Sequence, residues 1–154
     1  MIKKYFYLFV FLLFTNCGFT PLYNSNNVNY KINITQISGD NIINNTMMSE
    51  IQRISKPSSK NVFNIKIHSN YEKRIISKNI KGSASGYQLI ATVNFQIIEN
   101  NKTETISYQE KQNIKKNSNS FDQINYENTI KESFATSFIR KFYLFHMILR
   151  SLFA

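Results

Sequence analysis

The one cysteine of the chain stands where a specific covalent reaction is expected. Cys17 follows a basic start and an apolar run over residues 5–14. This arrangement is typical of a secretory signal, and the thiol of a cysteine directly behind such a run can become a thioether to diacylglycerol. A single cysteine cannot form an internal disulfide. The sequence therefore predicts a signal peptide over residues 1–16 and lipidation of Cys17.

Two positions next to this cysteine depart from the usual lipoprotein signal. Asn16 stands where Gly, Ala or Ser is usual, and Phe14 stands where Leu is expected. The apolar run is interrupted at Asn16 and Gly18, before the ~20 residues that a spanning helix needs. An incidental buried thiol at Cys17 is the alternative, and we favour lipidation.

Other side chains that could support catalysis are scattered. His68 and His146 fall on different predicted elements, and Asp40 and Asp122 stand where helices are expected to begin. No spacing resembles a catalytic triad, a metal cluster or a phosphate-binding glycine loop. The sequence predicts no enzyme activity, no metal and no cofactor.

The residues from the cysteine onward carry a family resemblance. Cys-Gly-Phe-Thr-Pro-Leu-Tyr, over residues 17–23, resembles the start of the LPS-assembly lipoproteins LptE (RlpB) in their alphaproteobacterial form. The resemblance implies two helices packed on a four-stranded sheet. It also implies an outer-membrane lipoprotein, on the periplasmic side, that plugs the LptD β-barrel, helps the barrel assemble and contacts lipopolysaccharide.

Length and charge set further limits. Without residues 1–16, the 154-residue chain leaves 138 residues, enough for one domain with one core. Lys and Arg outnumber Asp and Glu by 19 to 9, which favours a polyanionic partner. The Lys-, Asn- and Ile-rich composition, typical of A/T-rich codons, weakens that argument. The chain has no recognisable nucleic-acid motif, so we expect no nucleic-acid partner.

The first half of the mature chain alternates between strand and helix patterns. Residues 17–27 are expected to form a lipidated tether, and residues 28–154 a single domain. Apolar and polar residues alternate over 28–37 and again over 61–76, which predicts two strands. Between them, Ile43, Met47, Ile51 and Ile54 recur at helical spacing, and this helix should end before Pro57.

The second half begins with two more strand patterns. The alternation over 87–97 is the clearest in the chain, and its second face is polar apart from Ile90, so we expect one side of the sheet to face water or a polar lumen. Residues 103–114 predict a fourth strand. A long helix follows, for which Ser120 and Gln123 fit a capping box. This order predicts an α+β sandwich, a four-stranded sheet with both helices packed on one face.

Two groups of residues are candidates for contact with other molecules. A basic cluster around the predicted hairpin is expected to contact lipopolysaccharide phosphates, with a merely solvated lysine-rich loop as the alternative; it comprises Lys73, Arg74, Lys78 and Lys81. The last helix becomes apolar around most of its circumference, which favours burial against a partner over an interfacial helix. Its candidate partner contacts are Phe138, Phe142, Phe145 and Leu149.

The sequence therefore favours a non-enzymatic accessory subunit with three partners: the LptD barrel, lipopolysaccharide and the outer membrane. The main alternative is a free-standing periplasmic lipid-binding lipoprotein. That protein would need an enclosed apolar pocket, whereas a plug would have a filled core and an exposed contact surface.

Overall fold

The computed structural model describes residues 30–99 and 102–148, with side chains described to residue 145. Its elements in chain order are β1 (Tyr30–Ser38), α2 (Asn41–Ile54), β2 (Asn61–Lys78), β3 (Ala84–Glu99), β4 (Lys102–Lys115), α3 (Ser120–Phe142) and a final π-helical turn η2 (Tyr143–Ile148). The predicted signal peptide, Cys17, the tether and Leu149 lie outside the described residues.

The four strands form one mixed sheet in the order β1-β2-β3-β4. The strands β2, β3 and β4 are antiparallel neighbours, whereas β1 is parallel to β2 and is connected to it through α2. A parallel pair needs such a crossover because its second strand starts at the same end as the first. The predicted α+β class, with four strands and two helices, is confirmed.

A tight turn connects β1 to α2. Gly39 has a φ of +110°, and a Cβ atom there would stand 1.8 Å from the carbonyl oxygen of Ser69. Asp40 then caps the helix, because its side chain accepts hydrogen bonds from the backbone N–H groups of Ile42 and Ile43 at 3.0 and 3.1 Å. The helix ends at Ile54, before Pro57, as predicted.

One core lies between the sheet and the helices. Alternate residues of β2 and β3 point into it, among them Ile65, Val93 and Phe95, which are fully buried. From α3, Phe142 stacks on Phe95 with ring centroids 4.6 Å apart. From α2, the apolar stripe that was predicted supplies Ile43, Met47 and Ile51.

The cap of α3 differs from the prediction. Asn119, not Ser120, is the N-cap, and its side chain accepts from the N–H of Phe121 at 2.9 Å. Gln123 does not reach back to Ser120; its side-chain oxygen accepts from the backbone N–H of Asn117 at 2.6 Å. Asn is as good an N-cap as Ser, so the capping chemistry moved by one residue.

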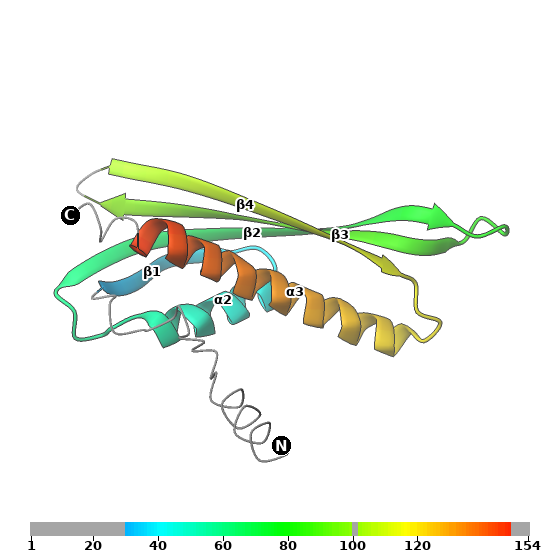
Figure 1. Ribbon diagram of the computed structural model, residues 1–154, viewed down its shortest axis with the longest axis horizontal. Coiled ribbons are helices and arrows are strands. Elements are labelled where there is room, and N and C mark those ends of the chain that lie inside the picture. The colour runs from blue at the N-terminus through cyan, green and yellow to red at the C-terminus, as the bar shows by residue number, and fades with distance from the viewer. Residues whose placement is uncertain (1–29, 100–101, 149–154) are drawn as a thin grey trace, which may run out of the picture.

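Both helices cover the same face of the sheet, and the other face is open (Figure 1). The helix-facing row of β3 is buried, while Thr92, Asn94 and Gln96 of the open face are not. Ile90 is an exception on that face: its neighbours Glu72 and Lys111 flank it in the register, and it is buried. The predicted polar, uncovered sheet face is therefore present.

Candidate functional site

The strands β2 and β3 extend past the helices as a two-stranded arm that ends in a tight turn (Figure 1). At the turn, Asn79 accepts hydrogen bonds through its side chain from the N–H groups of Lys81 and Ser83, both at 3.0 Å. Gly82 has a φ of +77°, which suits glycine in such a turn. The turn therefore fixes the backbone between the lysines of the predicted basic cluster.

The structure divides the predicted basic cluster into two residues that are paired with carboxylates and two that are not. The ammonium group of Lys73 forms an ion pair with Glu127 of α3 and lies 4.2 Å from the ring centroid of Tyr87. Arg74 forms a 2.6 Å ion pair with Glu72 two residues away. Within the described part of the chain, the ammonium groups of Lys78 and Lys81 have no ion-pair partner. These two lysines are the cluster members whose charges remain available to a ligand.

Apolar side chains accompany these lysines. Six of the eight large apolar residues exposed in the described chain lie either on the arm or on the first turns of α3. They are Ile75, Ile76, Ile80, Phe121, Ile124 and Tyr126. Because the N–H of Lys116 donates to the carbonyl of Ser85 at 2.9 Å, the loop that leads into α3 is attached to the arm. We call residues 73–86 and 115–126 the hairpin end.

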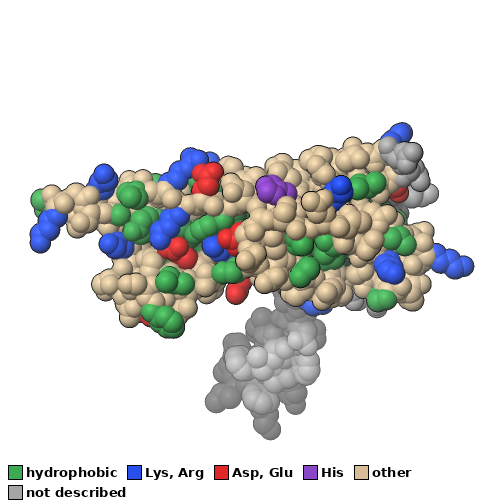
Figure 2. Space-filling model, turned by 180° about the vertical axis from the view of Figure 1, so that it is seen from behind, with side chains coloured by type: hydrophobic (Ala, Val, Ile, Leu, Met, Phe, Trp, Pro, Cys, Tyr) green, Lys and Arg blue, Asp and Glu red, His purple; other side chains and the backbone are tan. Residues whose placement is uncertain are grey.

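The hairpin end thus combines cations with exposed hydrocarbon. Figure 2 shows Lys and Arg side chains beside apolar ones at this end, on the left of that view. Exposed apolar residues that gather in one region are typical of interaction sites, and lysines next to them add attraction for phosphate. Sequence reasoning named the basic residues and missed the apolar ones, although Ile75, Ile76 and Ile80 stand among the lysines in the sequence.

A charged network under α3 holds this helix on the sheet near the hairpin end. Lys131 of α3 donates to the Asp40 carboxylate at 2.7 Å and lies 4.1 Å from the ring centroid of Tyr71. The Tyr71 hydroxyl is buried close to the Glu127 carboxylate. Burial, and then the negative charges of Glu127 and Asp40, raises the pKa of Tyr71 above its ordinary value. This network has a structural role, because its charged groups form ion pairs with one another.

The open sheet face holds the only described histidine side chain. The Nδ1 atom of His68 lies 2.9 Å from the Ser38 hydroxyl, in a shallow surface hollow of about 290 Å³ whose other side chains include Lys66 and Asn94. No carboxylate lines this hollow to orient the imidazole, and a serine nucleophile needs an oriented base. Over residues 30–99 and 102–145, no group of three metal-ligating side chains occurs. The absence of enzyme activity stays a prediction.

The predicted partner contacts on the last helix have different positions. Phe138 and Phe142 are buried in the domain core. The prediction that they contact a partner is therefore wrong for these two residues, because the apolar stripe of α3 faces the sheet. Phe145 is 60% exposed. Within the described range, no helix is long and apolar enough to cross a membrane.

Comparisons with known proteins give structural likeness without sequence likeness. No protein-family model matches the chain, and no curated protein matches it. Rare lipoprotein B from Shewanella oneidensis is similar in structure with a TM-score of 0.57 and 10% identity, over 78% of this chain and 98% of that one. A minor lipoprotein from Acinetobacter baumannii gives a TM-score of 0.51 and 13% identity, over 73% and 91% of the two chains.

A putative lipoprotein from Caulobacter crescentus is similar at a TM-score of 0.50 and 11% identity, over 73% of this chain and 85% of that one. At these identities the likeness concerns the fold. The predicted LptE-like fold is therefore confirmed, and three independently solved lipoproteins have it.

Proposed function

We propose that this protein is an outer-membrane lipoprotein that acts as the accessory plug subunit of an LptD-type β-barrel, with a non-enzymatic role in assembling the barrel and moving lipopolysaccharide. The observation that carries the proposal is the shared fold with rare lipoprotein B, which extends over 98% of that protein. The motif over residues 17–23 supports the same assignment from a part of the chain outside the described residues.

The surface chemistry agrees with a plug. A subunit inside a water-lined lumen would present polar groups to the lumen, and the open sheet face carries Thr92, Asn94 and Gln96 at alternate positions of β3. The described core is filled by tightly packed rings such as Phe95 and Phe142. A free-standing lipid carrier would instead hold acyl chains in an enclosed pocket.

The hairpin end is the proposed contact for lipopolysaccharide. Its lysines can pair with lipid phosphates while its isoleucines lie against acyl chains, which is how basic and apolar residues share a lipid surface. Lys78 and Lys81 take over the main role within the predicted cluster, because Lys73 and Arg74 are already paired with carboxylates.

Co-purification tests the partner. Full-length tagged protein is extracted from membranes in mild detergent, and mass spectrometry identifies both the bound proteins and the N-terminal residue. We expect a large β-barrel in a stable complex and an acylated Cys17. Acylated protein recovered alone contradicts the plug role and favours the lipid carrier, whereas an uncleaved N-terminus contradicts the lipoprotein assignment.

Binding of purified lipopolysaccharide tests the hairpin end. Each lysine near an anionic lipid surface contributes ~1 kcal/mol, so the double substitution Lys78→Gln with Lys81→Gln should weaken binding by roughly thirtyfold. The matched control is Lys31→Gln with Lys60→Gln, which removes the same charge at the opposite end of the sheet. Equal effects of the two pairs would show that only net charge matters.

A further inference from the structure

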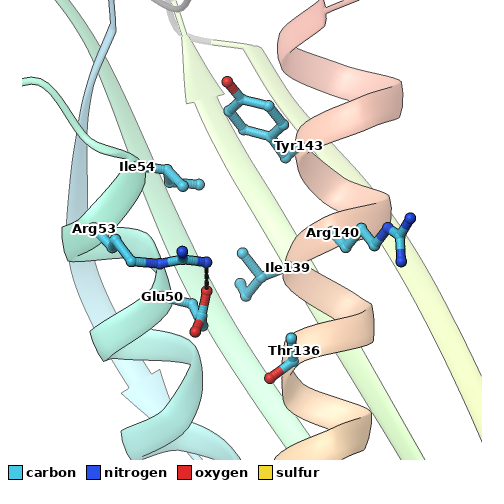
Figure 3. Close-up of a pocket in the computed structure, with 7 residues that line it drawn as sticks. All are labelled: Glu50, Arg53, Ile54, Thr136, Ile139, Arg140 and Tyr143. Atoms are coloured by element: carbon cyan, nitrogen blue, oxygen red, sulfur yellow. Dashed lines mark hydrogen bonds and ion pairs between the residues drawn. The ribbon is translucent and has the colours of Figure 1, made fainter. Parts of the chain in front are cut away.

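A groove lies between the C-terminal ends of α2 and α3 (Figure 3). Its volume is about 450 Å³. Seven residues from the two helices and the start of η2 line it: Glu50, Arg53, Ile54, Thr136, Ile139, Arg140 and Tyr143. The groove lies on the helix side of the domain and is separate from the hairpin end.

The groove combines apolar side chains with one ion pair. Ile54 and Ile139 face each other across it, with the Tyr143 ring at its upper end in the view of Figure 3. Arg53 and Glu50 of α2 are joined by a 2.5 Å ion pair that reaches toward α3, and the Arg140 side chain points away from the groove (Figure 3). Because Arg53 and Glu50 neutralise each other, an occupant would not need a charge and would lie against the apolar side chains.

The start of β1 lies beside this groove. The backbone N–H of Lys56 donates to the carbonyl of Tyr30 at 3.0 Å, and the N–H of Ile32 donates to the Ser55 hydroxyl at 2.9 Å. Ile54, which lines the groove, directly precedes Ser55 in the chain. The polypeptide that precedes Tyr30 therefore enters the domain next to the end of the groove.

We propose that residues 18–23, Gly-Phe-Thr-Pro-Leu-Tyr, bind in this groove and fix the N-terminal segment to the domain. Tyr23 precedes Tyr30 by seven residues, a length that spans at most ~25 Å when fully extended, so the groove is within reach. The segment carries three large apolar side chains, on Phe19, Leu22 and Tyr23, and has no charged side chain. This matches the apolar side chains of the groove.

Pro21 makes this docking less costly, because its fixed φ leaves fewer conformations to lose on binding. If Cys17 carries the lipid, its anchor then stands one residue from the docked segment. Only residues 24–29 then remain as a tether, between the docked segment and Tyr30. The membrane then lies near the C-terminal ends of α2 and α3. This inference does not depend on the barrel partner.

Site-specific photo-cross-linking tests the proposal in the full chain on its membrane. Benzoylphenylalanine replaces Tyr23, a position where an aromatic ring is already present, and cross-linked peptides are mapped by mass spectrometry. We expect the main products to join residue 23 to the segments around Ile54, Ile139 and Tyr143. The substitution Thr136→Trp, at an exposed groove residue, should fill the groove and reduce these products at least fivefold.

Ser107→Trp is the matched control, because it adds the same ring at an exposed position on the open sheet face; it should leave the products unchanged. Cross-links spread evenly over β1 and the sheet would overturn the proposal. So would a groove filled instead by residues 149–154, detected as groove cross-links from a probe at Phe153 and none from position 23. Products with another protein or lipid alone would equally overturn it.

Discussion

The two glycines with positive φ allow a sharp test of how the β1–α2 turn is built. Gly39 and Gly82 have φ angles of +110° and +77°, so alanine is strained at both. At Gly82 the added Cβ meets nothing within 4 Å, whereas at Gly39 it stands 1.8 Å from the Ser69 carbonyl oxygen. Only alanine at position 39 therefore forces the backbone to move.

The expected magnitudes follow from this difference. A non-glycine residue in the left-handed region costs ~1–2 kcal/mol, and this is the whole cost at Gly82. At Gly39 a forced displacement of packed groups adds ~1–3 kcal/mol. It also disturbs the 2.9 Å hydrogen bond from the Asp40 N–H to the Ser69 hydroxyl, so Gly39→Ala should cost ~4 kcal/mol in all.

Urea unfolding followed by circular dichroism, with Gly82→Ala as the control, measures both free energies of unfolding. A domain of this size has only ~5–15 kcal/mol of stability, so the Gly39→Ala midpoint should fall well below that of the control. Losses equal within ~0.5 kcal/mol would refute the close approach of Gly39 to β2.

Three further substitutions have defined outcomes. Lys131→Met should cost ~2 kcal/mol in urea unfolding, because it leaves the Asp40 carboxylate largely buried without its cation, and in an Asp40→Asn background the same change should cost much less; an unchanged cost would contradict the pairing. Tyr71→Phe should remove a loss of stability that the protein otherwise shows above pH ~10. The pKa of Tyr71 is raised in the folded protein, so the unfolded chain loses the phenol proton more readily and the free energy of unfolding falls as the pH rises. Urea titrations at several pH values would measure this fall. Phe138→Ala should cost ~4 kcal/mol and Phe145→Ala less than ~0.5 kcal/mol in the same assay, because only Phe138 is buried; similar losses would contradict the burial difference.

Periodicity predicted the elements of the fold well, for a physical reason. Each strand of the sheet has one buried face, so apolar residues repeat every second position in β2 and β3, and the stripe on α2 repeats at helical spacing. Pro57 also marked the end of α2. The parallel pairing of β1 with β2 was not predictable, because alternation shows which face of a strand is buried and not which neighbour the strand has.

The candidate site was only partly predictable because charge pairing is long-range. Nothing in the local sequence indicates that Lys73 meets Glu127, 54 positions away, or that Lys131 meets Asp40, 91 positions away. The basic cluster therefore looked uniform in the sequence, although half of its charge is already used. The phenylalanine stripe of α3 was recognised, but its direction toward the sheet depends on the packing of the whole domain.

The tip of the β2–β3 arm has consequences for folding energetics. Around Ile80, which is fully exposed, the strands are held by main-chain hydrogen bonds, and an isolated pair of strands is marginally stable in water. Opening this tip should cost far less free energy than unfolding the core, so its amides should exchange with solvent much faster than those near Ile65. Binding can therefore order or reshape the tip at little cost to the rest of the domain.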